Sequence, residues 1–319
     1  MEKTVLGRTG IVVTRLCVGT WQAHGWSTSN DEMFKRTLTH ALDRGINFID
    51  TAPAYGEGHS ERLVGDVIAG RRDSVVVATK FHHTQSRPDQ IEAALQASLR
   101  NLRTDYIDLY QQHWPPRTPP LVETIAALQK LRERGLIRAI GVSNWMEPEW
   151  QEIADPTPID SLQPCYSLVW RSIEPTVLPL MRRHSIAVIP YSPLAQGILA
   201  GRVTPAHVPT DFRAKNRLLR PEFFARIEPI LAELTTIARV YDKTPAQTAL
   251  RWLLDVSGIT AVIVGASNPH QVDENLGALD WRLSANDHAR LDAISRSVSS
   301  DLQPHDTLWG WHPRGGSRR

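Results

Sequence analysis

The stretch Ile46-Asn47-Phe48-Ile49-Asp50-Thr51-Ala52-Pro53-Ala54-Tyr55-Gly56 is an apolar run that ends in an acid and continues into a loop with a tyrosine. Two later stretches have the same form, Val75-Val76-Val77-Ala78-Thr79-Lys80 and Tyr106-Ile107-Asp108-Leu109-Tyr110-Gln111-Gln112-His113-Trp114-Pro115. Short, nearly continuous apolar runs are typical of strands buried in a parallel sheet. Because the carboxyl ends of parallel strands meet at one edge, we expect Asp50, Tyr55, Lys80 and His113 to lie on one rim.

Strand-like and helix-like segments alternate along the chain. Helix-like segments carry apolar residues at spacings of three and four, as in Ile91, Leu95, Leu99 and Leu102. The expected strands are residues 16–19, 46–49, 75–78, 106–110, 137–142, 160–163, 186–189 and 261–264. Buried parallel strands that alternate with helices in this number predict an α/β fold, the (β/α)8 TIM barrel. An open doubly wound sheet is the competing fold, but residues 18–22 lack the glycine fingerprint that usually follows its first strand.

Other segments fall outside this repeat. Residues 3–15 are expected to form a β-hairpin that caps the barrel floor, with its turn at Thr9-Gly10. A long loop over residues 199–224 precedes helical patterns near 222–241 and 244–256, which predict extra C-terminal helices. No low-complexity linker divides the chain, so a single domain over residues 1–319 is favoured. Residues 300–319 form a tail with Trp309 and Trp311, which either covers the active site or remains disordered.

The bulk composition excludes several classes of protein. The 319 residues are 41% hydrophobic and 22% charged, with a net charge of +2 and with both signs mixed along the chain. Nucleic acid and membranes are therefore not expected as partners. Cys17 and Cys165 lie in apolar surroundings, and the amino-terminal residues form no apolar signal region, so a cytoplasmic protein with free thiols is expected. The histidines show no spacing with cysteines or carboxylates that is typical of a metal site, so no metal is predicted. Both a monomer and a homo-oligomer are compatible with these properties.

The polar residues at the strand ends match those of a known family. Here the chain resembles the aldo-keto reductase superfamily, and within it the branch of bacterial aldo/keto reductases and potassium-channel β-subunits. The resemblance extends from residue 6 to about residue 278. It implies an NAD(P)H-dependent oxidoreductase acting on CH–OH and carbonyl groups. It also implies that Asp50, Tyr55, Lys80 and His113 are the catalytic residues.

Carbonyl reduction also gives each of these residue types a role that does not depend on the resemblance. Hydride transfer to a carbonyl leaves negative charge on its oxygen, so a positioned acid is required. Tyrosine is a poor acid at neutral pH unless a cation stabilises its phenolate, and Lys80 can supply that charge. Asp50 can hold the lysine in place. His113 can donate a hydrogen bond to the substrate oxygen or share the proton of Tyr55.

The resemblance also implies how a nicotinamide nucleotide is held. Residues after strands five and six would bind the carboxamide, Tyr191 would stack on the nicotinamide ring, and the loop that follows would track the pyrophosphate. The expected cofactor-binding residues are Thr20, Trp21, Asp50, Ser143, Asn144, Gln163, Tyr191, Ser192, Pro193, Leu194, Gln196, Gly197, Arg202, Arg213, Gly265, Ser267, Gln271, Glu274 and Asn275.

The choice between NADP(H) and NAD(H) depends on the adenosine end. Many family members have Lys at the position of Gly265 and Arg at that of Gln271, and use both on the 2′-phosphate. This chain lacks those charges. Preference for NADP(H) over NAD(H) is still expected, and it rests on Ser267, Arg202 and Arg213.

Aromatic residues are expected around the substrate. The chain has ten tryptophans, and several fall on the rim that carries the catalytic residues. An aromatic wall favours apolar or aromatic aldehydes and ketones over polar sugars, although some of these rings can simply pack loops onto the barrel. The expected pocket residues are Trp21, Trp26, Tyr55, Phe81, His113, Trp114 and Trp145.

Three functions are compatible with this reading. The first is an NADPH-dependent aldo-keto reductase that reduces aldehydes or ketones to alcohols, with the proton from Tyr55. The second is an NAD(P)-dependent dehydrogenase that oxidises a sugar or a polycyclic alcohol. The third is a non-catalytic, redox-sensing NADP(H)-binding subunit, as in the channel β-subunits. That branch typically has Asn where this chain has His113 and bears a longer amino-terminal extension, which favours an enzyme.

Overall fold

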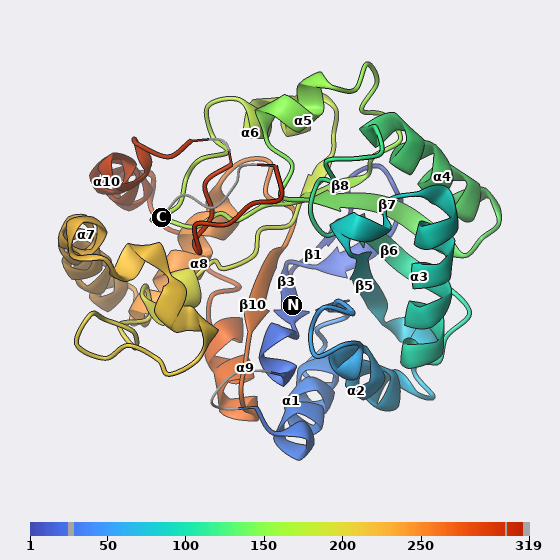
Figure 1. The fold of residues 1–319 in the computed structure, drawn as a ribbon. Coiled ribbons are helices and arrows are strands. Elements are labelled where there is room, and N and C mark those ends of the chain that lie inside the picture. Colours follow the sequence, from blue (N-terminus) through green and yellow to red (C-terminus); the bar gives the residue numbers. More distant parts are fainter. Residues whose placement is uncertain (25–28, 304, 315–319) are drawn as a thin grey trace.

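Parallel strands form the centre of the molecule. The computed structural model describes residues 1–24, 29–303 and 305–314, and within them an eight-stranded sheet has the order β10-β3-β4-β5-β6-β7-β8-β9 (Figure 1). Each pair of neighbours in this order is parallel. The strands are β3 (Leu16–Gly19), β4 (Phe48–Asp50), β5 (Val76–Phe81), β6 (Ile107–Gln112), β7 (Ile137–Ser143), β8 (Ser161–Gln163), β9 (Ala187–Val188) and β10 (Val262–Gly265). Every strand overlaps one of the predicted segments.

Hydrogen bonds between the first and last strands of this order close the sheet. The N–H of Thr260 donates to the carbonyl of Val188 at 2.8 Å, and the N–H of Ile263 donates to the carbonyl of Pro190 at 2.9 Å. Closure removes the exposed sheet edges and directs all carboxyl ends of the strands to one rim. The predicted (β/α)8 barrel is thereby confirmed. Cys17 is a free, buried thiol in this barrel.

A hairpin covers the opposite end of the barrel. It consists of β1 (Lys3–Val5) and β2 (Val12–Thr14), paired antiparallel. The N–H of Thr14 donates to the side chain of Asn47 at 2.8 Å, and the guanidinium of Arg8 donates to the carbonyl of Ile159 at 3.0 Å. Both acceptors lie just before barrel strands, so the hairpin closes the amino-terminal end, as predicted.

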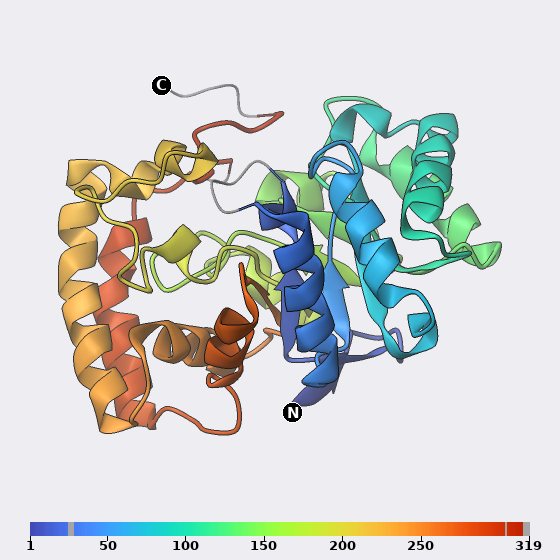
Figure 2. The ribbon, with the colours of Figure 1, turned by 90° about the horizontal axis from the view of Figure 1, so that it is seen from below.

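Helices surround the barrel (Figures 1 and 2). They are α1 (Asp31–Asp43), α2 (His59–Ile68), α3 (Pro88–Leu102), α4 (Leu121–Glu133), α5 (Glu147–Gln151), α6 (Val177–Arg183), α7 (Pro221–Val240), α8 (Pro245–Asp255), α9 (Pro269–Leu276) and α10 (Ala285–Ser295). Apolar positions three and four apart face the core, as Ile91, Leu95 and Leu99 do in α3. None of the helices in the described parts of the chain has the length and apolar character needed to span a membrane.

The C-terminal helices include two predicted segments and one that was not predicted. α7 and α8 occupy the helical patterns near residues 222–241 and 244–256. α10 packs along α7, and Figure 2 shows the two side by side at one edge of the molecule. Its sequence, ANDHARLDAIS, has few large apolar residues, so hydrophobic periodicity gives little signal there.

Candidate active site

The four residues predicted to be catalytic come together at the carboxyl ends of β4, β5 and β6. Asp50 ends β4, and Tyr55 lies in the loop that leads from β4 to α2. Lys80 is the penultimate residue of β5, and His113 follows β6 directly. The N–H of His113 donates to the carbonyl of Phe81 at 3.0 Å, which extends the pairing of β5 with β6 by one residue. All four residues therefore lie at the ends of barrel strands or in the loops that directly follow them.

The ammonium of Lys80 is completely buried and has three oxygen partners. It donates to Oδ1 of Asp50 at 2.6 Å, to the carbonyl of Thr51 at 2.9 Å and to the hydroxyl of Tyr55 at 3.3 Å. The other carboxylate oxygen of Asp50 accepts a hydrogen bond from Nε2 of Gln163 at 2.7 Å. Buried charges are tolerated only when they are paired and further hydrogen-bonded, and this pair meets both conditions.

His113 lies beside the tyrosine and is tied to the opposite strands. The rings of Tyr55 and His113 meet edge to face, with centroids 5.9 Å apart. Nδ2 of Asn144 donates to the carbonyl of His113 at 3.0 Å, and the hydroxyl of Tyr191 donates to Oδ1 of Asn144 at 2.8 Å. Asn144 has a φ of 61°, a left-handed conformation that asparagine tolerates better than most residues. These contacts connect His113, and through it the four predicted catalytic residues, to the side of the barrel formed by β7 and β9.

Burial determines the protonation of the group. Burial raises the pKa of Tyr55, and the repulsion of Asp50 adds to it, so the nearby Lys80 offsets the increase only in part. Lys80 acts to lower the pKa of the phenol, as the sequence led us to expect, but burial has the larger effect. Burial acts to lower the pKa of Lys80, but Asp50 and Tyr55 outweigh it and the pKa is raised. Burial first, and Lys80 second, hold the pKa of His113 well below its usual range, so the imidazole is neutral at pH 7.

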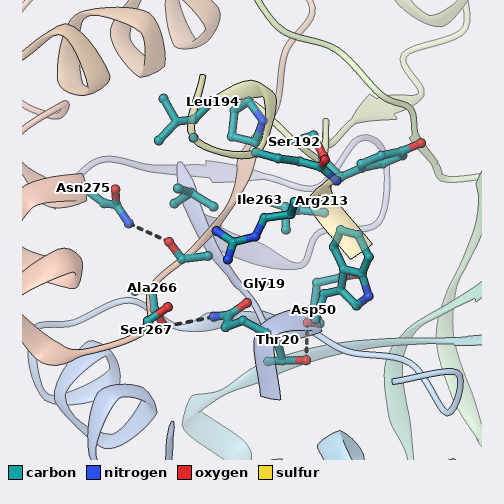
Figure 3. Close-up of a pocket in the computed structure, with 18 of the residues that line it drawn as sticks. Gly19, Thr20, Asp50, Ser192, Leu194, Arg213, Ile263, Ala266, Ser267 and Asn275 are labelled. Atoms are coloured by element: carbon teal, nitrogen blue, oxygen red, sulfur yellow. Dashed lines mark hydrogen bonds between the residues drawn. The ribbon is translucent and has the colours of Figure 1, made fainter. Parts of the chain in front are cut away.

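A cavity of about 960 Å³ extends from this group across the rim. Its volume is at the upper end of the range for small-molecule sites. Every residue predicted to bind the cofactor lines it. In Figure 3 the side chain of Arg213 extends into the cavity between Ser192 and Leu194 on one side and Gly19 and Thr20 on the other.

One wall of the cavity is a loop in a constrained conformation. Ser192, Ala195 and Gln196 have φ values of 53°, 48° and 61°, which only a small fraction of residues other than glycine adopt. Strained backbone of this kind concentrates at binding sites. Nε2 of Gln196 is buried in this wall without a hydrogen-bond partner in the described parts of the chain, although its Oε1 accepts from Asn216 at 3.1 Å. An unpaired buried donor beside a cavity fits a ligand with acceptor oxygens.

Cationic and amide groups line other parts of the cavity wall. Arg202 pairs with Glu274 at 3.0 Å, and Arg213 pairs with Asp211 at 2.6 Å. Nδ2 of Asn275 donates to the carbonyl of Gly265 at 3.2 Å. Asn268, the N-cap of α9, also lines the cavity, and a helix amino terminus favours anions. This donor set fits the phosphates and ribose hydroxyls of a dinucleotide.

Only some of the predicted substrate residues reach the cavity. Trp21, Tyr55, His113 and Trp114 line it. Trp26 lies outside the described residues.

Phe81 and Trp145 do not reach the cavity, contrary to the prediction. Both side chains are completely buried in the core. Phe81 packs against Tyr110, and the indole N–H of Trp145 donates to Gln112 at 2.9 Å. Each therefore packs the barrel rather than its mouth.

Some residues that line the cavity were predicted only as one of two alternatives, or not at all. Trp309 and Trp311, in the tail that was expected either to cover the site or to be disordered, both line the cavity. Trp309 lies 5.5 Å from Trp21 and 5.6 Å from Phe212 between ring centroids. Phe212 and Gln22 were not predicted at all, because a lone aromatic or amide in a loop has no periodicity to reveal it.

The described side chains were also searched for a group that could hold a metal ion. Within residues 1–24, 29–303 and 305–314, no group of three or more His, Cys, Asp or Glu side chains is placed to hold a metal ion. That no metal takes part stays a prediction.

Comparison with known proteins identifies relatives along nearly the whole chain. Residues 15–296 match the model of the aldo/keto reductase family. The NADH-specific methylglyoxal reductase of Escherichia coli is 36% identical, over 93% of this chain and 99% of that protein. Among solved structures, the glycerol dehydrogenase AKR11B4 from Gluconobacter oxydans has a TM-score of 0.82 and 32% identity, covering 93% of this chain and 96% of that one. An aldo-keto reductase from Klebsiella pneumoniae in complex with NADPH has a TM-score of 0.78 and 31% identity, covering 95% and 97%.

Proposed function

Because the chain belongs to the aldo/keto reductase family and is an NAD(P)H-dependent oxidoreductase, we propose that it reduces aldehydes or ketones to alcohols with Tyr55 as the proton donor. The contact that carries the proposal is the buried chain from Asp50 through Lys80 to the hydroxyl of Tyr55, with lengths of 2.6 and 3.3 Å. It ends at a cavity that can hold both a nucleotide and a carbonyl compound.

Each member of the group has a distinct part in this proposal. When bound, the nicotinamide cofactor supplies the hydride. Tyr55 gives its proton to the carbonyl oxygen as negative charge develops there. Lys80 stabilises the phenolate left behind, and Asp50 keeps the ammonium in position. His113 is neutral, so one ring nitrogen can donate a hydrogen bond to the same oxygen without carrying a competing charge.

Tyr55 is protonated at neutral pH, which is the state that the reductive direction requires. A phenol with a raised pKa holds its proton at neutral pH, and a proton is what carbonyl reduction consumes. Alcohol oxidation by the same residues needs the phenolate as base. The relative described as a glycerol dehydrogenase makes oxidation the second direction to test.

For the cofactor we propose NADP(H) in preference to NAD(H). The support is the pair of guanidinium groups, of Arg202 and Arg213, on the cavity wall. Arg202 already pairs with Glu274, so a phosphate there would compete with a carboxylate. One relative is named as NADH-specific and another as an NADP(+) enzyme, so members of the family differ in this choice.

The test is a set of initial rates. NADPH and NADH are compared with benzaldehyde, 4-nitrobenzaldehyde and methylglyoxal, and NADP⁺ and NAD⁺ with glycerol and benzyl alcohol. We expect reduction with NADPH to give the highest kcat/KM. We also expect Arg202→Gln to raise the KM for NADPH about tenfold with little effect on that for NADH, since one charge-assisted hydrogen bond to phosphate is lost. Equal use of both cofactors would contradict the NADP(H) choice, and no reduction of any carbonyl compound would contradict the function.

A further inference from the structure

A second cavity lies directly outside the first. Its volume is about 550 Å³, and it is more open to solvent. It is lined by Val208, Ala214, Lys215, Asn216, Arg217, Leu219, Arg220, Trp309, Gly310 and Trp311. Trp309 and Trp311 line both cavities, so the two cavities adjoin at these rings.

Two chain segments build the outer cavity. One contains the short helical turns Phe212–Lys215 and Arg217–Leu219, and the other is the C-terminal segment around Trp309. The N–H of Arg217 donates to the carbonyl of Leu308 at 2.8 Å, and its guanidinium pairs with Asp306 at 3.1 Å. Figure 2 shows the two segments beside each other at the top of the view. Direct contacts therefore fix the two walls of the cavity relative to each other.

The outer cavity is positively charged. Three of its lining residues are cationic, and none of those in the described parts of the chain is acidic. Asp306 neutralises Arg217, but Lys215 and Arg220 are exposed and form no ion pair within the described residues. The ammonium of Lys215 lies over the ring of Phe212, 5.1 Å from its centroid. Two uncompensated cations in a concave site favour an anionic group.

The rim of the cavity is apolar. Val208 and Trp311, which both line it, are each 44% exposed, although large apolar side chains are usually buried. Grouping of such residues at one mouth is typical of a ligand-binding surface. Trp309 continues the apolar path inward, because its ring lies parallel to that of Tyr191 with centroids 6.3 Å apart.

We infer that the outer cavity binds a carboxylate on the substrate, at the end of an apolar body that runs past Trp309 and Trp311 to the carbonyl at Tyr55. The inference deepens the proposed function and rests on it, since it names the class of carbonyl compound. The preferred substrates are then aldehydes or ketones whose carbonyl and carboxylate are separated by an extended apolar linker.

The cofactor is the other source of anionic groups. Its phosphates would lie along the inner cavity, which Arg202 and Arg213 line. Lys215 and Arg220 line only the outer cavity, beyond the two tryptophans. Their position therefore assigns them to the substrate rather than to the nucleotide.

The test uses (4-formylphenoxy)alkanoic acids of increasing chain length, each paired with its methyl ester. The ester keeps the aldehyde and the apolar body but removes the charge. We expect kcat/KM for the acid to exceed that for the ester about tenfold at the chain length that spans both cavities, through KM, as one charge-assisted contact would give. The advantage should decrease as ionic strength rises. Equal values for acid and ester at every length would overturn the inference.

Matched variants locate the effect. Lys215→Gln combined with Arg220→Gln should abolish the acid preference and leave the ester rates and the KM for NADPH unchanged. Lys130→Gln removes a charge from the exposed face of α4 and should leave the acid preference intact. If the double variant instead raises the KM for NADPH and keeps the acid preference, the cations serve the cofactor and the inference is wrong.

Binding without turnover separates this inference from the proposed function. The intrinsic fluorescence of the protein is titrated with 4-phenoxybutanoate and with its methyl ester, neither of which can be reduced. Quenching by the acid that is lost in the double variant supports the outer site even if no carbonyl compound is reduced. Failure of the acid to bind better than the ester would overturn the outer site even if aldehydes are reduced.

Discussion

At the scale of single residues, the Asp50–Lys80 pair forms the electrostatic surroundings of the Tyr55 hydroxyl. The carboxylate satisfies a lysine that is otherwise completely buried, and the lysine donates to the phenol. Burial is the largest influence on the pKa of Tyr55 and raises it; Lys80 acts to lower the pKa and Asp50 to raise it. The phenol of Tyr55 is therefore protonated at neutral pH. In the proposed mechanism, Lys80 would stabilise the phenolate as it forms.

The protonation states predict the shape of the pH profile. Tyr55 keeps its proton below its raised pKa, and His113 stays neutral above its lowered one. We expect kcat for aldehyde reduction to change by no more than about twofold between about pH 6 and pH 9, and kcat for alcohol oxidation to rise over the same interval. Steady-state rates at saturating cofactor measure both. A reduction rate that falls through an apparent pKa near 7 would contradict this account.

The buried pair also predicts a large effect on stability. Asp50→Asn leaves the ammonium of Lys80 buried without its counter-ion, and we expect the free energy of unfolding to fall by about 3–5 kcal/mol. The control is Asp43→Asn, which breaks the exposed pair of Asp43 with Arg71 and should cost less than about 1 kcal/mol. Urea denaturation of the three proteins compares them. Similar costs for both variants would show that the buried pair contributes no more than a surface pair.

At the scale of elements, a buried carboxylate anchors the C-terminal segment. Glu149, in α5, is completely buried and lies 3.0 Å from Nε2 of His305 and 3.3 Å from the guanidinium of Arg314. The ring of His312 stacks on that of His305, with centroids 4.3 Å apart. These contacts flank Trp309 and Trp311 on both sides, so the anchor sets where the aromatic wall lies.

This anchor predicts a loss of stability in acid. Burial first, and the neighbouring His305 second, lower the pKa of His312 from 6.5 to about 4. Between these values the unfolded chain binds a proton that the folded chain does not, so stability must fall as the pH decreases from 6.5 to 4. His312→Asn should reduce this decrease, as measured by the urea midpoint at about pH 7 and pH 5. The wild type and the variant should run parallel above about pH 7.5, and an unchanged acid decrease in the variant would remove His312 as its cause.

At the scale of the whole molecule, the sequence predicted what periodic patterns and strand ends encode. The barrel, the hairpin and the co-location of Asp50, Tyr55, Lys80 and His113 all follow from buried strands that end in polar residues. Phe81 and Trp145 were misplaced because residue type alone does not tell which side of a strand end faces the mouth.

Other features depend on long-range packing that one sequence does not encode visibly. Trp309 reaches the cavity through contacts with Trp21 and Phe212, each far away along the chain. Likewise, the raised pKa of Tyr55 results mainly from burial, which the residue types alone do not reveal. The sequence predicts which side chains interact, but it does not predict how burial and neighbouring charges together set a pKa.

The most direct test of the central claim compares turnover and cofactor binding in Tyr55→Phe. The variant removes only the hydroxyl that Lys80 contacts, and the ring of Tyr55 can keep its packing against His113. We predict that kcat for aldehyde reduction falls at least about 10²- to 10⁴-fold, the usual contribution of a general acid, while the Kd for NADPH from fluorescence titration changes less than about threefold. Retained turnover, or loss of NADPH binding along with activity, would contradict the role of Tyr55 as the proton donor.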